Sequence, residues 1–212
     1  MNSQNTLRIK DLLTLITIYS VTKCSLRHLI AYMKALYYRL RTHKKLNIFI
    51  YLTRYLIGFA FIPSGLTKLK GFRFTKAGTD TPIGYFFEAL YQTGPYWQFL
   101  GAIQLLAAFL LMSQRFATLG AILFFSIMGN IWVITMSMNF SGTYIITSLM
   151  LLANLILIAW DWYKIKFMLY PDNFQYQYKN FIIPAIKPIW ITIGIIIFFL
   201  SLGSMIMLSH FK

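Results

Sequence analysis

The sequence "LTRYLIGFAFIPSGLTKLKG", residues 52–71, indicates the fold class of this chain. An apolar helix of about 20 residues, rising 1.5 Å per residue, crosses the roughly 30 Å of hydrocarbon in a bilayer. This stretch is apolar enough to do so, yet Arg54 lies inside it and Lys68 follows close to its end. A charged side chain inside a membrane is costly and usually faces other helices or a ligand. The stretch therefore predicts a membrane helix whose arginine has a partner.

The composition supports a membrane protein and excludes several other classes. Of the 212 residues, 58% are hydrophobic and 12% charged, and the mean hydropathy is +0.62, whereas soluble domains are about half apolar and a quarter charged. The net charge of +15 comes mostly from lysines and arginines that flank apolar segments. Residues in these positions orient the protein in the membrane and contact anionic lipid, which is favoured here over nucleic-acid binding. The single cysteine, Cys24, excludes an intrachain disulfide or a CxxC redox pair. No metal site is predicted, and no histidine pair for haem lies inside an apolar block.

Five apolar segments are long enough to span a bilayer: 47–66, 97–112, 116–136, 144–160 and 188–208. Short connections join the second span to the third and the third to the fourth, which favours antiparallel neighbours. The predicted fold is thus an all-α membrane protein, with an antiparallel four-helix transmembrane bundle, a fifth C-terminal transmembrane helix and an N-terminal amphipathic helix.

The same segments divide the chain into four parts. They are a basic amphipathic segment (1–46), a four-helix membrane domain (47–162), a cytoplasmic linker (163–187) and the fifth span with its tail (188–212). Within the first part, apolar residues from Leu26 to Leu40 recur at helical spacing beside basic ones, as in a helix lying on an anionic surface; Met33 is an alternative start. Basic residues are concentrated before the first span, which predicts a cytoplasmic N-terminus and an external C-terminus in the inner membrane.

Polar and small residues follow one face of each of the first four spans. In the first span Arg54, Gly58, Phe61, Gly65 and Lys68 recur at steps of three and four, which places them on one stripe of a helix. Similar stripes occur in the next three spans: Trp97, Gly101, Gln104, Ala108, Leu111 and Arg115; Ser126, Asn130 and Ser137; Thr147, Asn154 and Asp161. The stripes predict a polar seam between the four helices, either for ligand binding or for hydrogen bonding between helices at about 1 kcal/mol or less per contact.

Arg54 has three alternative environments. Its guanidinium can extend to the lipid headgroups, bind an anionic or quinone-like ligand, or pair with an acidic residue. Asp161 ends the fourth span on the same predicted side and is the candidate ion-pair partner. On the other side, the segment 82–94 contains Glu88 among aromatic residues and predicts a short interfacial helix, with Glu88 as a candidate partner of Lys68.

The residues "RYLIGFAFIPSGLTKLKG" and "GAIQLLAAFLLMSQRFATLGAILFFSIMGN" resemble the first three helices of DoxX-like membrane proteins. The resemblance covers roughly residues 48–162 and places Arg54, Gly58, Ser64, Lys68, Gln104 and Arg115 at motif positions. One departure matters, because relatives often carry a glutamate where this chain has Gln104. The resemblance implies links to thiosulfate:quinone oxidoreductase or quinol oxidase complexes for some relatives and accessory or stress-response roles for others.

Two functional hypotheses follow. The first is a non-catalytic subunit or assembly factor that binds a membrane partner or a lipid in the polar seam, because metal ligands, redox cysteines and nucleotide motifs are missing from the sequence. The alternative is a quinone-binding subunit of a redox complex, in which Arg54, Gln104 and Asn130 would bind a quinone carbonyl. No cofactor other than quinone is expected; the expected partners are the bilayer and another membrane protein or a second copy of the chain.

Overall fold

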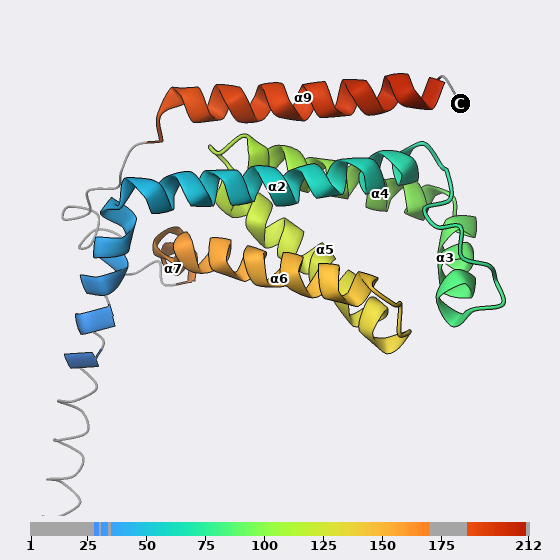
Figure 1. Ribbon diagram of the computed structural model, residues 1–212, viewed down its shortest axis with the longest axis horizontal. Helices are drawn as coiled ribbons and strands as arrows, with labels where there is room; N and C mark the ends of the chain where they lie inside the picture. The colour runs from blue at the N-terminus through green and yellow to red at the C-terminus, as the bar shows by residue number, and fades with distance from the viewer. Residues whose placement is uncertain (1–27, 30, 34, 170–185, 211–212) are drawn as a thin grey trace, which may run out of the picture. The chain divides into compact units, whose positions relative to one another are not determined.

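The computed structural model describes residues 28–29, 31–33, 35–169 and 186–210. The chain divides into two compact units, residues 1–47 and 48–212. Throughout the described residues of the second unit, the regular structure is helical (Figure 1).

Among the described residues, five helices are long and apolar enough to cross a membrane. They are α2 (Lys44–Leu69), α4 (Pro95–Met112), α5 (Ala117–Ser137), α6 (Thr143–Trp160) and α9 (Pro188–His210). Their bounds agree with the predicted spans to within three residues at each end, because long apolar runs leave little ambiguity about the helix that they form. Two shorter helices lie in the same part of the chain: α3 (Pro82–Gln92) and α7 (Trp162–Leu169).

Two short turns connect α4, α5 and α6. α4 packs against α5, and α5 packs against α6 (Figure 1). Gln114 has a φ of 57° in the first turn, and Asn139 and Gly142 have φ values of 47° and 76° in the second. Such left-handed residues reverse the chain within a few positions, as the short connections require.

Close backbone contact joins α2 to α4. A Cβ atom added at Gly101 of α4 would lie 2.4 Å from the Leu69 nitrogen and 2.5 Å from the Gly65 carbonyl oxygen. Only glycine permits this approach, which is the packing that small residues provide between membrane helices. Deeper inside, the rings of Phe61 on α2 and Phe124 on α5 stack with centroids 4.0 Å apart.

The last helix, α9, packs on α4 and α2. A Cβ atom at Gly194 would lie 1.8 Å from the Met112 carbonyl oxygen at the end of α4. The Tyr55 hydroxyl of α2 donates a hydrogen bond to the Trp190 carbonyl. Only 11% of the 18-residue apolar window of α9 is buried inside the protein, so most side chains of this helix are exposed on the outer surface.

In the first unit, the described residues between 28 and 42 are helical. Leu29, Tyr32 and Met33 are more than half exposed there, and contact of this segment with an anionic surface stays a prediction. The rest of the predicted basic segment, residues 1–27, lies outside the described residues, as do residues 170–185 of the predicted linker.

Candidate functional site

Arg54 lies in a buried polar cluster where α2 meets the end of α6. The Arg54 Nη2 atom is 2.7 Å from Asp161 Oδ2, and both side chains are about 2–3% exposed. Thr118 Oγ1 of α5 donates to the same carboxylate oxygen at 2.9 Å, and Lys164 Nζ lies 3.9 Å from the other oxygen. The predicted ion pair between Arg54 and Asp161 is therefore confirmed.

Gln114 completes this cluster from the turn between α4 and α5. Its side chain is fully buried, and its Oε1 accepts a hydrogen bond of 2.9 Å from Arg54 Nη1. Its backbone is in the left-handed region, with φ at 57°, where residues other than glycine are strained by roughly 1–2 kcal/mol. The hydrogen bond to Arg54 and the burial of the side chain hold Gln114 in this conformation.

Two substitutions at Gln114 separate the side chain from the backbone. Gln114→Ala and Gln114→Gly both remove the hydrogen bond to Arg54, but only glycine adopts a positive φ without strain. We expect Gln114→Ala to lower the free energy of unfolding by about 1 kcal/mol more than Gln114→Gly. Unfolding in mixed detergent micelles, followed by circular dichroism, measures the difference; equal values for the two variants would contradict the role of the backbone.

A second buried polar cluster surrounds Lys68, about 21 Å further along α2, at 1.5 Å per residue. Lys68 is 6% exposed. Its Nζ donates to Ser64 Oγ and, at 3.1 Å, to Gln104 Oε1 of α4. Nζ also lies 4.2 Å from the ring centre of Phe74 and 5.2 Å from that of Trp97, which is the range of cation–π contacts.

The two clusters differ in charge compensation. Arg54 has a carboxylate partner, whereas none of the ion pairs among the described residues includes Lys68. The acceptors of Lys68 are uncharged oxygen atoms and aromatic faces. A buried cation without a carboxylate is stabilised when an anionic or carbonyl oxygen approaches it.

An apolar layer separates the two clusters. Phe61 lies halfway along the stripe from Arg54 to Lys68, and its ring stacks on Phe124. Ile62 and Met128 are also buried, with 0% and 1% exposure. The predicted continuous seam is thus divided into two polar sites with a hydrocarbon interior between them.

The remaining predicted residues are dispersed. Asn154 is buried and donates to the Ala121 carbonyl at 3.1 Å, a contact between α6 and α5. Gly58 faces Met112: a Cβ atom added at Gly58 would lie 2.8 Å from the Met112 Cγ atom. Glu88 lies on α3, as the predicted interfacial helix requires, but its ion-pair partner is Arg73, at 2.7 Å, and not Lys68. Asn130 lies on the exposed face of α5.

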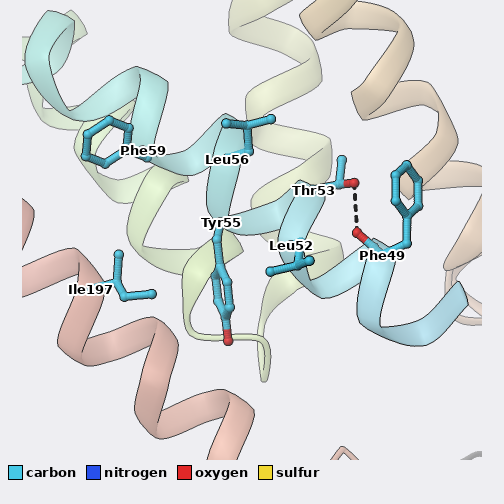
Figure 2. Close-up of a pocket in the computed structure, with 7 residues that line it drawn as sticks. All are labelled: Phe49, Leu52, Thr53, Tyr55, Leu56, Phe59 and Ile197. Carbon is cyan, nitrogen blue, oxygen red and sulfur yellow. Dashed lines mark hydrogen bonds between the residues drawn. The ribbon is translucent and has the colours of Figure 1, made fainter. Parts of the chain in front are cut away.

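A separate apolar groove runs along the outer surface of α2 beside α9 (Figure 2). It is open, has a volume of about 510 Å³, and is lined by Phe49, Leu52, Thr53, Tyr55, Leu56, Phe59 and Ile197. Both hydroxyls of the lining are bonded within the chain: Thr53 donates to the Phe49 carbonyl of its own helix, at 2.9 Å, and Tyr55 donates to the Trp190 carbonyl. The groove therefore fits a hydrocarbon chain but offers nothing that would select a polar head group.

Sequence reasoning missed Gln114, Thr118 and Phe74. Gln114 and Thr118 flank the exposed Arg115, and only the shortness of the turn indicated that one of its polar side chains would have to point inward. Phe74 lies in an irregular loop, where no periodicity predicts which side chain covers the helix ends.

The apolar spans and the buried charges at their ends define a multi-pass membrane protein. Residues 49–137 match the DoxX family model, so the part of the chain from α2 to α5 is similar to DoxX proteins. This result confirms the resemblance for these helices, whereas α6, which supplies Asp161, lies beyond the matched residues. Comparisons with curated proteins and with solved structures found no match.

Proposed function

We propose that this protein is a non-catalytic subunit or assembly factor of the inner membrane that binds an anionic membrane lipid, or an acidic group of a membrane partner, at the Lys68 cluster. The proposal includes an antiparallel bundle of α2, α4, α5 and α6, with the N-terminus in the cytoplasm. Positively charged residues before the first span support that orientation.

One observation carries the proposal: Lys68 is buried, and no carboxylate of the described residues pairs with it. Nearer the middle of α2, the comparable cation Arg54 is neutralised by Asp161 at 2.7 Å. An anionic oxygen from outside the chain would do the same for Lys68, and Ser64 and Gln104 already hold its amine in place. Lys68 is in the last turn of α2, near the level where lipid head groups lie.

The groove between α2 and α9 supports lipid as the ligand class. Its lining is apolar apart from the hydroxyls of Thr53 and Tyr55, which are both bonded within the chain, and it is open along the outer surface of α2 (Figure 2). An acyl chain gains contact there without desolvating a polar group.

Quinone binding at the same cluster is the alternative. A quinone carbonyl would accept from Lys68 Nζ, and Trp97 and Phe74 lie close enough to this amine to contact the ring. The protein would then be a subunit of a redox complex whose electron carriers belong to other chains.

The test replaces Lys68 with methionine, which keeps the length of the side chain and removes its charge. Protein purified in mild detergent is examined by native mass spectrometry, and bound molecules are extracted and identified. We expect stoichiometric anionic lipid on the wild type and at least a tenfold loss of affinity in Lys68→Met, equivalent to about 1.4 kcal/mol.

Lys76→Met is the matched control, because Lys76 is exposed in the loop that follows α2; it should retain wild-type binding. Equal lipid binding by Lys68→Met and the wild type, or no bound lipid or partner in either, would reject the proposal. Stoichiometric quinone in the extract, lost in Lys68→Met, would instead support the redox alternative.

A further inference from the structure

The polar stripe of α5 points in the opposite direction from the other three. Phe61 and Lys68 of α2, Gln104 of α4, and Asn154 of α6 are buried. On α5, by contrast, Ser126, Asn130 and Ser137 are all exposed. The described helices pack against the other side of α5, where Ala121, Phe124 and Met128 have exposures of 0–1%.

Asn130 lies deep in the span. It is three residues from the centre of α5 (Ala117–Ser137), or about 4.5 Å along the helix axis. Half of the hydrocarbon thickness is about 15 Å. The amide therefore lies at a depth where water is scarce and where an unsatisfied polar group is strongly disfavoured.

The amide is only partly satisfied by its own helix. Its Nδ2 donates to the Ser126 carbonyl at 2.8 Å, and among the described residues the second N–H and the Oδ1 oxygen have no hydrogen-bond partner. Ser126 has its hydroxyl bonded to the Ile122 carbonyl at 3.1 Å. The unmet donor and acceptor of Asn130 therefore lie on the exposed face of α5.

We propose that this face of α5 is a contact surface for a second copy of the same chain, with Asn130 hydrogen-bonded to Asn130 of the other copy. An amide carries both a donor and an acceptor and is therefore complementary to itself across a twofold axis. All copies insert in one orientation, so an α5–α5 contact about an axis normal to the membrane is parallel and brings equivalent residues together.

The spacing of the exposed residues fits this geometry. Leu119, Ser126, Asn130, Val133 and Ser137 follow each other at steps of seven, four, three and four, which is the repeat of a left-handed helix pair. Leu119 and Val133 are 56% and 55% exposed, and a Cβ atom at Gly129 would meet nothing within 4 Å. An asparagine at one core position of a parallel helix pair fixes its register and its number of strands. This surface is independent of the Lys68 cluster.

Disulfide cross-linking in native membranes tests the contact. Cys24→Ser removes the one native cysteine, and Ser126→Cys or Val133→Cys then places a thiol on the α5 face while Asn130 stays intact. Two differently tagged copies are expressed together and oxidised. We expect a band of twice the chain mass that carries both tags, and at least a fivefold weaker band when Asn130→Leu is added to Val133→Cys. Asn130→Gln should restore the band, because glutamine keeps the amide.

Leu152→Cys is the matched control, because Leu152 is 56% exposed on α6; it should give no comparable band. Equal cross-linking at Leu152→Cys and Val133→Cys would overturn the proposal, because it would show that the bands come from random collisions between chains. The absence of cross-linking along the α5 face would overturn it as well, and so would a band that pairs the chain with a different protein. Circular dichroism of Asn130→Leu should match that of the wild type, so that a weaker band reports association and not unfolding.

Discussion

Replacing Arg54 with leucine should lower the free energy of unfolding by about 3–5 kcal/mol, the usual effect of removing one partner of a buried ion pair. The reason is the carboxylate left behind: Asp161 is 2% exposed, and its remaining polar side-chain partners among the described residues would be Thr118 and the more distant Lys164. Reversible unfolding of the purified protein in mixed detergent micelles measures this loss.

A second substitution should recover part of the loss. In Arg54→Leu/Asp161→Asn the remaining amide is neutral and still accepts from Thr118, so the buried charge disappears. We expect a coupling energy of about 0.5–3 kcal/mol between the two positions, the range for residues in contact. Arg115→Leu, at an exposed arginine in the neighbouring turn, should change the stability little. If Arg54→Leu were as mild as Arg115→Leu, the ion pair would not stabilise the fold.

Gly101→Ala should be the most damaging small substitution in α4. The added methyl group would lie 2.4 Å from the Leu69 nitrogen and 2.5 Å from the Gly65 carbonyl oxygen. These are backbone atoms of α2, which cannot rotate aside as a side chain would. We expect a loss of about 3 kcal/mol, at the upper end of the usual effect of overpacking, measured by the same unfolding experiment.

Gly203→Ala in α9 is the control for this substitution, because a Cβ atom there would meet nothing within 4 Å. Both changes replace a helical glycine, so the gain in helix propensity, up to about 1 kcal/mol, is shared. Gly203→Ala should be neutral or slightly stabilising. Similar stability of the two variants would show that α2 and α4 tolerate a wider separation.

The spans and the ion pair were predictable for simple physical reasons. Apolar length defines a membrane helix, and the chain has so few acidic residues that Asp161 was the natural partner for Arg54 on the same predicted side. The stripes on α2, α4 and α6 correctly indicated buried faces, because most polar residues in these spans are more stable between helices than in lipid.

The same reasoning failed to predict which way the polar stripe of α5 faces and where along the helices the buried polar residues cluster. The stripe on α5 has the same spacing as the others, yet it is exposed, because periodicity shows which residues share a face and not what covers that face. The division of the seam into two clusters depends on the stacking of Phe61 on Phe124, two residues on different helices. The role of Gln114 was not predicted, because it depends on a left-handed backbone conformation that the conformational preferences of glutamine do not indicate.

The contact between Arg54 and Asp161 also imposes an order on biosynthesis. The two residues are 107 positions apart, and at a synthesis rate of about 5–20 residues per second the carboxylate follows the guanidinium by roughly 5–20 s. During that interval α2, α4 and α5 emerge while the arginine has no acidic partner from α6. The nascent chain therefore carries an uncompensated charge until α6 has been inserted, and any truncation before residue 161 leaves Arg54 without this carboxylate.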